Sequence, residues 1–81
     1  MKVTIRLFSV AKDIAGFEER QIDLAEQSKA ADVLEFLKQH NAQFSKWGNS
    51  LRLAVNFEYV SNDHSLKSGD EVAVIPPVSG G

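Results

Sequence analysis

One stretch of this 81-residue chain has the pattern of an amphipathic helix, and it constrains the fold more than any other feature. Within residues 29–40, apolar side chains recur at the spacing of one helix face: Ala30, Val33, Leu34 and Leu37. A chain of this length forms one small domain. Because a single helix covers one face of one sheet, the other apolar runs should form a single sheet packed against it.

The two ends of this helix carry signals of their own. Ser28 is expected to cap the first turn through its hydroxyl oxygen. Asn41 tolerates the left-handed backbone that commonly ends a helix. The following segment, 42–50, places Phe44 and Trp47 three residues apart, which predicts one short helical turn over the core.

Apolar and polar residues alternate in the remaining runs, which is the period of a half-buried strand. The predicted strands are 2–10, 19–24, 51–55, a short one around 57–60, and 71–75. The first two are joined by a connection that contains Gly16, so we expect them to form a hairpin. Asn56 should begin the tight turn into the short strand, and Pro76 should end the last strand because it cannot donate to a ladder.

The expected order is strand, strand, helix, strand, short strand, strand, in an α+β domain. The first and last strands can pair in parallel at the centre of a mixed sheet of about five strands, with the helix in the crossover. This arrangement is the ubiquitin-like β-grasp fold. We expect residues 1–81 to form one such domain, with 76–81 as a flexible C-terminal tail.

Charge and composition argue against several kinds of function. The formal net charge is -2 and Lys and Arg are not clustered, so a nucleic-acid partner is not expected. Without cysteine, the chain has no disulfide, thiolate metal site or catalytic thiol. His40 and His64 lack metal-ligand partners at suitable spacing, and no Ser-His-acid triad can be assembled. A metal site and side-chain catalysis are therefore not expected.

The first ten residues, "MKVTIRLFSV", indicate where the protein works. Lys2 and Arg6 interrupt the apolar pattern, so this run is predicted to be neither a signal peptide nor a membrane span. We expect a cytoplasmic protein with no membrane partner.

The C-terminal stretch "PPVSGG", residues 76–81, combines stiff and loose residues. Two prolines favour an extended geometry that would hold the tail away from the domain. Two glycines lack Cβ atoms, so their backbone can pass through a narrow channel. We expect a tail that enters a partner's site, made up of Pro76, Pro77, Val78, Ser79, Gly80 and Gly81. A frayed chain end is the simpler alternative.

The α-carboxyl group of Gly81 is the reactive group that such a tail can present. An ionised carboxylate is a poor electrophile, so it must first be converted to a mixed anhydride, typically with AMP. The chain shows no ATP site, so we expect no bound cofactor and an activating partner that uses the ATP. Attack by sulfide or a persulfide would then give a C-terminal thiocarboxylate, which suits a chain without a cysteine to carry the sulfur.

The sequence "LKSGDEVAVIPPVSGG", residues 66–81, resembles the C-terminal signature of the molybdopterin synthase small subunit, the MoaD family. "LAVN", residues 53–56, resembles the third strand of that family and its Asn turn. Length, helix register and strand order agree, so the likeness covers nearly the whole chain. Two pairs of residues depart from the family pattern. Lys-Asp stands at 12–13 where Arg-Glu is frequent, and Val-Ile stands at 74–75 where Phe-Phe is frequent.

The resemblance implies a ubiquitin-like sulfur carrier. Its terminal glycine, here Gly81, would be adenylated by an E1-like adenylyltransferase. A donor such as a cysteine desulfurase or rhodanese would supply the sulfur of the thiocarboxylate. The tail would then enter the large subunit of molybdopterin synthase, in a heterotetramer of two small and two large subunits. There the sulfur would go to cyclic pyranopterin monophosphate to build the molybdopterin dithiolene. The small subunit would be a non-catalytic, sulfur-donating component of this sulfurtransferase complex.

Strand parity suggests a docking surface beside the tail. Phe8, Ala73 and Ile75 should point away from the helix and can form an apolar partner interface. Ordinary, partly exposed strand residues are the alternative. Two other functions stay open. One is a related carrier for thiamine thiazole, tRNA thiolation or conjugation to protein lysines. The other is a β-grasp protein-binding module without tail chemistry.

Overall fold

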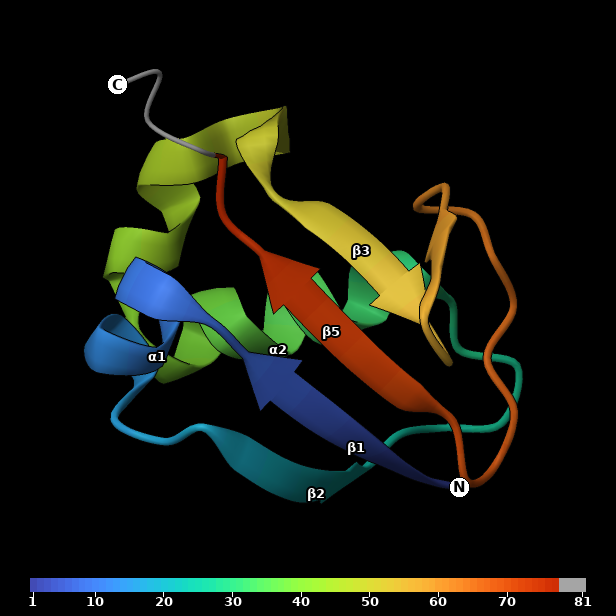
Figure 1. Ribbon diagram of the computed structural model, residues 1–81. Helices are drawn as coiled ribbons and strands as arrows, with labels where there is room; N and C mark the ends of the chain where they lie inside the picture. The colour runs from blue at the N-terminus through green and yellow to red at the C-terminus, as the bar shows by residue number, and fades with distance from the viewer. Residues whose placement is uncertain (78–81) are drawn as a thin grey trace.

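The chain follows the predicted order of elements with one addition. The structure, a computed structural model, describes residues 1–77 (Figure 1). The elements are β1 (Lys2–Leu7), α1 (Ser9–Ala15), β2 (Glu19–Asp23), α2 (Ala30–His40), the 3-10 helix η1 (Ala42–Ser50), β3 (Arg52–Val55), β4 (Glu58–Val60) and β5 (Glu71–Ile75). The added element is α1, and η1 occupies the segment in which a short helical turn was predicted.

The strands form one mixed sheet in the order β2-β1-β5-β3-β4. β1 and β5 pair in parallel at its centre, from Thr4 opposite Glu71 to Leu7 opposite Val74. The other neighbouring strands are antiparallel. Helix α2 crosses one face of this sheet (Figure 1). The predicted β-grasp fold, with the first and last strands side by side, is confirmed.

The core lies between α2 and the face of the sheet that it covers. All four residues of the predicted helix stripe are buried. The largest fully buried side chains are Val3, Ile5, Leu7, Val33, Leu37, Phe44, Leu53, Val72 and Val74. Burying each aliphatic side chain of this size contributes ~1.5–3 kcal/mol. Successive side chains of a strand point to opposite faces of the sheet. The residues that alternate with these buried ones therefore point to the other face, where the candidate site lies.

The first two strands pair antiparallel, as the predicted hairpin requires. Helix α1, however, occupies a segment for which the pattern predicted the end of the first strand and an irregular connection. β1 ends at Leu7, and Ala11 and Ala15 are buried one helical turn apart on α1. Gly16 ends the helix in the left-handed conformation, with φ 84°. The prediction was wrong because residues 8–10 alternate apolar and polar as in a strand, although out of phase with residues 2–7. Two buried alanines are too weak a helical signal to outweigh it.

Both predicted ends of the main helix differ in the structure. The Ser28 hydroxyl bonds within the preceding loop, and the N–H of Lys29 instead donates to the Asp32 carboxylate at 2.7 Å. The carboxylate in the first turn thus satisfies the N–H of the N-cap residue, and the expected cap by the Ser28 hydroxyl is not formed. Asn41 has an extended backbone, with φ -152°, rather than a left-handed one. Its side chain accepts from the N–H of Gln43 and so caps the next helix, η1.

The turn between β3 and β4 lies where Asn56 predicted it. Asn56 and Phe57 both have positive φ, 51° and 74°, as in the two-residue hairpin turns that suit twisted strands. The Asn56 side chain ties this turn to the start of β5. Its Oδ1 accepts from the N–H of Glu71 at 3.0 Å, and its Nδ2 donates to Oδ1 of Asp70 at 2.9 Å.

Candidate functional site: the outer sheet face and the root of the tail

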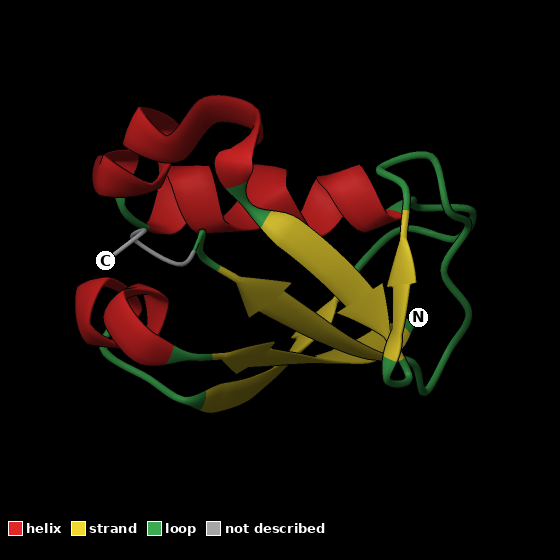
Figure 2. Ribbon diagram, turned by 45° about the horizontal axis from the view of Figure 1, so that its top comes forward, coloured by secondary structure: helices red, strands yellow, loops and turns green. Residues whose placement is uncertain are grey.

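The face of the sheet turned away from α2 carries a row of residues, one from each strand. The register pairs Arg6 with Glu19 and with Ala73. It also pairs Ala54 with Ala73 and with Tyr59. Two methyl groups therefore lie at the centre of the row, with longer side chains on either side. Figure 2 shows α2 and η1 along one side of the sheet. The row lies on the other side, because its residues alternate with the buried strand residues that face α2.

The two alanines leave a hollow in this face, which we call the sheet-face hollow. Its volume is about 230 Å³. It is lined by Arg6, Phe8, Ala54, Phe57, Tyr59, Glu71, Ala73 and Ile75. Side chains stand roughly perpendicular to a sheet, so short ones between long ones produce a concavity. The lining is mostly apolar, with charged groups at one rim.

A second hollow lies where β5 leaves the sheet, and we call it the tail-root hollow. Its volume is about 510 Å³. It is lined by Phe8, Ser9, Val10, Trp47, Ile75, Pro76 and Pro77. Phe8 and Ile75 line both hollows. The two hollows therefore form one continuous apolar surface that leads to the C-terminal segment.

The large apolar side chains that are most exposed in residues 1–77 gather on this surface. The exposed fractions are 44% for Phe8, 42% for Val10, 87% for Phe57 and 61% for Tyr59. Each of the four lines at least one of the two hollows. Singly scattered apolar residues are ordinary on a protein surface, whereas a contiguous patch marks a site that binds another molecule.

The three predicted interface residues, Phe8, Ala73 and Ile75, lie together around the sheet-face hollow. Phe8 reaches it from an unexpected position, because it lies just beyond β1, at the N-terminal end of α1. The next residue, Ser9, has φ 57°, which is uncommon for a residue with a Cβ atom. This sharp change of backbone direction separates the strand from the helix.

Pro76 and Pro77 are the part of the predicted tail that the structure describes. Pro76 is buried and Pro77 is exposed, and both line the tail-root hollow. The first proline therefore belongs to the folded domain, contrary to the expectation that both prolines hold the tail away from it. The apolar ring of Pro76 is removed from water there, which explains the difference. The remaining predicted tail residues, Val78, Ser79, Gly80 and Gly81, lie outside the described residues.

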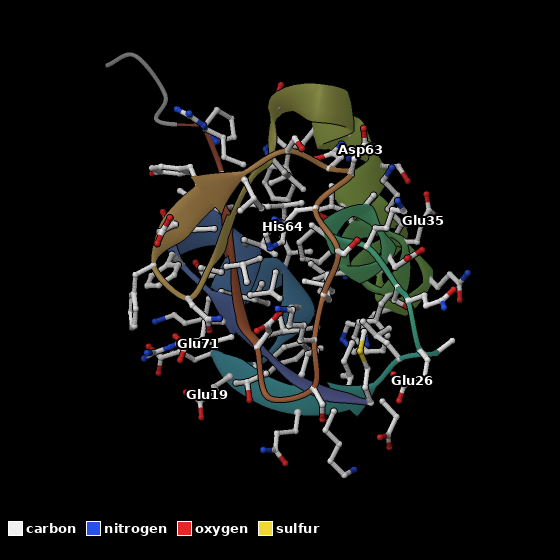
Figure 3. The ribbon with its side chains drawn as sticks, turned by 90° about the vertical axis from the view of Figure 1, so that its right-hand side faces the viewer. Glu19, Glu26, Glu35, Asp63, His64 and Glu71 are labelled. Carbon is white, nitrogen blue, oxygen red and sulfur yellow. The ribbon has the colours of Figure 1, made fainter. Side chains whose placement is uncertain are left out.

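Charged side chains border the sheet-face hollow. Arg6 lies between two carboxylates, with Nη1 3.3 Å from Oε1 of Glu71 and Nε 3.5 Å from Oε1 of Glu19. Figure 3 shows both glutamates on the same side of the molecule. Elsewhere at the hollow, the guanidinium carbon of Arg52 lies 4.5 Å from the centre of the Tyr59 ring. These pairs are partly exposed, so each contributes only ~0.2–1 kcal/mol to stability. Their main effect is to place charged groups of both signs along the rim of the sheet-face hollow.

The two histidines and the acidic residues are the side chains that were considered as metal ligands. Among residues 1–77, no three His, Asp or Glu side chains lie close enough together to hold a metal ion. His40 ends α2, with Nε2 2.9 Å from the carbonyl oxygen of Ala15. His64 lies on an exposed loop. No helix in these residues is long and apolar enough to cross a membrane.

Sequence patterns did not single out Val10, Phe57 or Tyr59 as parts of this surface. Val10 was assigned to a strand that is a helix in the structure. Tyr59 lies beside Ala54 only because of the register between β3 and β4, which pattern alone does not give. An aromatic residue directly after Asn56 was the one available signal, because glycine is the usual residue at that place in such a turn.

Fold and surface together define a class of protein. It is a ubiquitin-like β-grasp domain whose apolar outer face extends to Pro76 and Pro77, and whose sequence has a Gly-Gly pair at 80–81. The model of the ThiS family matches residues 5–81, nearly the whole chain. The protein belongs to the ThiS family.

Several similar proteins have names that indicate a function. The molybdopterin synthase sulfur carrier subunit of Dictyostelium discoideum is 41% identical over 80 residues, covering 95% of this chain and 93% of the relative. The solved structure of molybdopterin converting factor subunit 1 from Pyrococcus furiosus has a TM-score of 0.85 at 34% identity. That match covers 96% of this chain and 99% of the other.

Two further solved structures bear on partners. A chain in the complex of subunits 1 and 2 of the Helicobacter pylori molybdopterin-converting factor has a TM-score of 0.68 at 27% identity, covering 100% of both chains. The small archaeal modifier protein 1 of Methanosarcina acetivorans has a TM-score of 0.80 at 26% identity. It covers 99% of this chain and 96% of the modifier.

Proposed function

We propose that this protein is the sulfur carrier subunit of a molybdopterin synthase. The observation that carries the proposal is the 41% identity, over nearly the full length, with a relative that bears this name. The Gly80-Gly81 ending and the apolar surface at the root of the tail support it. A cytoplasmic location is part of the same proposal, and it rests on the sequence alone.

The proposed chemistry takes place at the carboxylate of Gly81. An E1-like enzyme binds ATP, and the carboxylate attacks the α-phosphorus, forming an acyl adenylate and releasing pyrophosphate. Hydrosulfide displaces AMP directly to give the thiocarboxylate. A persulfide on a cysteine desulfurase or rhodanese would instead give an acyl disulfide, which a second thiol reduces to the same product. The carrier itself needs no bound cofactor for any of these steps.

The large subunit then receives the charged tail. Gly80 and Gly81 allow the tail to pass into a narrow site, because neither has a Cβ atom. The sulfur is transferred to cyclic pyranopterin monophosphate, and two loaded tails supply the two sulfurs of the dithiolene. We propose a heterotetramer of two small and two large subunits. The complex of subunits 1 and 2 from the Helicobacter pylori relative supports a stable pairing of this kind.

The surface around Phe8, Ala73 and Ile75 is the proposed docking site for these partners. It is apolar, concave and continuous with the root of the tail. Docking there would place Pro77 and the residues after it at the entrance of the partner's site. The chain would thus contribute position and sulfur, and the large subunit would contribute the groups that move protons.

Intact mass spectrometry tests the proposal directly. The protein is co-expressed with a candidate E1-like enzyme and a sulfur donor. We expect a mass gain that corresponds to one oxygen replaced by one sulfur, located on the C-terminal peptide. The loaded carrier, mixed with the large subunit, should then convert cyclic pyranopterin monophosphate to molybdopterin. Normal conversion by a protein that lacks residues 79–81 would contradict the proposal and would favour a binding module without tail chemistry.

A second candidate is a carrier with a different acceptor. The similarity to a small archaeal modifier protein favours conjugation to protein lysines as the strongest of these alternatives. Affinity purification of the full-length carrier distinguishes the candidates. Recovery of a molybdopterin synthase large subunit supports the first, whereas lysine-linked adducts, a thiazole synthase or tRNA thiolation enzymes support the second.

A further inference from the structure

The tip of the β3–β4 hairpin carries a residue that the fold itself does not require. Phe57 has φ 74°, a left-handed backbone that strongly favours glycine over a residue with a side chain. Its side chain is 87% exposed, so burial does not offset this cost. Backbone strain that brings no gain in packing is typical of residues retained for function.

Phe57 lies beside a cavity that can use it. It lines the sheet-face hollow together with Tyr59, and the floor of that hollow includes Ala54 and Ala73. A cavity of ~150 Å³ is large enough to hold benzene. The hollow, at about 230 Å³, can therefore hold one apolar side chain of the size of Leu, Met or Phe. Two exposed aromatic rings are available to cover such a side chain.

The charge on the rim indicates what accompanies that side chain. Glu19 and Glu71 share the single guanidinium of Arg6, which leaves a local excess of negative charge at the β1 side. The other guanidinium near the hollow, on Arg52, lies over the Tyr59 ring. A basic group on the partner would match the β1 side, since rim charges of opposite sign favour association.

We propose that the sheet-face hollow receives one apolar side chain of the large subunit, with a basic residue beside it on the β1 rim, and that Phe57 covers this side chain. The proposal rests on the proposed function, because it takes the large subunit as the occupant. It adds which cavity is filled, by what chemistry, and which residue of this chain determines the affinity.

Phe57→Gly separates binding from folding. Glycine relieves the strained backbone, so the melting temperature should be at least as high as that of the unmodified protein. The dissociation constant for the purified large subunit, measured by calorimetry on the full-length chain, should rise about tenfold or more. Gln27→Gly is the matched control. Gln27 also has positive φ, 69°, and is exposed, but it lies in the loop before α2. It should leave the dissociation constant unchanged.

Two further substitutions test the cavity and the rim. Ala73→Leu fills the hollow from its floor and should weaken binding at least as much as Phe57→Gly does. Ala25→Leu, on an exposed loop away from the sheet face, is its control. Glu19→Lys reverses the charge of one rim carboxylate. It should weaken binding at low salt and lose that effect as the salt concentration rises, because exposed charges are screened.

The outcomes separate this proposal from the proposed function. If the unmodified carrier binds the large subunit and Phe57→Gly and Ala73→Leu bind equally well, the cavity is not the docking site, although the proposed function stands. If both variants keep their affinity for the large subunit and lose it for the E1-like enzyme, the assignment of the occupant is wrong. If the unmodified carrier neither binds a large subunit nor acquires sulfur, the proposed function itself fails.

Discussion

His40, the last residue of α2, lies with its Nε2 2.9 Å from the carbonyl oxygen of Ala15, the last residue of α1. The imidazole ring also packs against Phe17 and Phe36, with centroid distances of 5.5 and 6.2 Å. The last carbonyl groups of a helix have no partner within the helix, so this contact satisfies one of them. It joins the ends of two helices and holds α1, which borders the tail-root hollow.

Replacing His40 with Ala should therefore lower the free energy of unfolding by ~1–2 kcal/mol, through the lost hydrogen bond and ring contacts. Urea denaturation followed by circular dichroism measures the change. His64→Ala, on an exposed loop, should change stability by less than ~0.5 kcal/mol. Equal losses for the two variants would show that the contact with Ala15 does not hold α1 in place.

Ser9 tests the turn between β1 and α1. Its φ of 57° disfavours any residue with a side chain, and most strongly a β-branched one. Ser9→Gly should leave the free energy of unfolding unchanged or raise it by up to ~1 kcal/mol, because relief of strain is partly cancelled by the greater entropy of the unfolded chain. Ser9→Val should lower it by ~1–2 kcal/mol. Equal free energies of unfolding for the Val and Gly variants would show that residue 9 does not have a left-handed backbone.

Asn56 has two separable roles, which two substitutions distinguish. Asn56→Gly keeps the positive φ but removes the bonds to Glu71 and Asp70, so it should cost ~1–2 kcal/mol. Asn56→Ala removes the same bonds and also disfavours the left-handed backbone, so it should cost ~1 kcal/mol more. Thermal and urea denaturation of the two variants measure the difference. Equal stability would mean that the backbone conformation contributes nothing.

Gly81 tests the chemistry without testing the fold. Gly81→Ala, or one residue added after Gly81, should abolish formation of the thiocarboxylate while the melting temperature stays unchanged. The physical reason is that the activating enzyme must bring one carboxyl group into line with ATP. A misplacement of ~1 Å can cost ~10²-fold in rate. Intact mass spectrometry gives the extent of sulfur loading. Ser68→Ala, in an exposed turn outside both hollows, is the control and should load normally.

Much of the architecture could be predicted because several local signals agree. The stripe from Ala30 to Leu37 and the alternation in the central strands point to the same layered core. The turn at Asn56 followed from the backbone that asparagine tolerates. The helix Ser9–Ala15 was missed because residues 8–10 alternate as in a strand, and Ala11 and Ala15 alone are a weak helical signal. The segment forms a helix because Ala11 and Ala15 pack against the core, which is a tertiary effect.

Some features of the candidate site likewise follow from the sequence, and others follow only from the tertiary structure. The amino-acid sequence by itself determined the order of the strands and the main helix, the apolar stripe, the lack of cysteine and the Gly-Gly pair at 80–81, because each depends on residue type and short-range spacing. Only the tertiary structure decided that Ala54 lies opposite Ala73, that Phe57 and Tyr59 flank them, and that Pro76 belongs to the domain. Strand register and cavity shape arise from contacts between distant parts of the chain, and no local pattern specifies them.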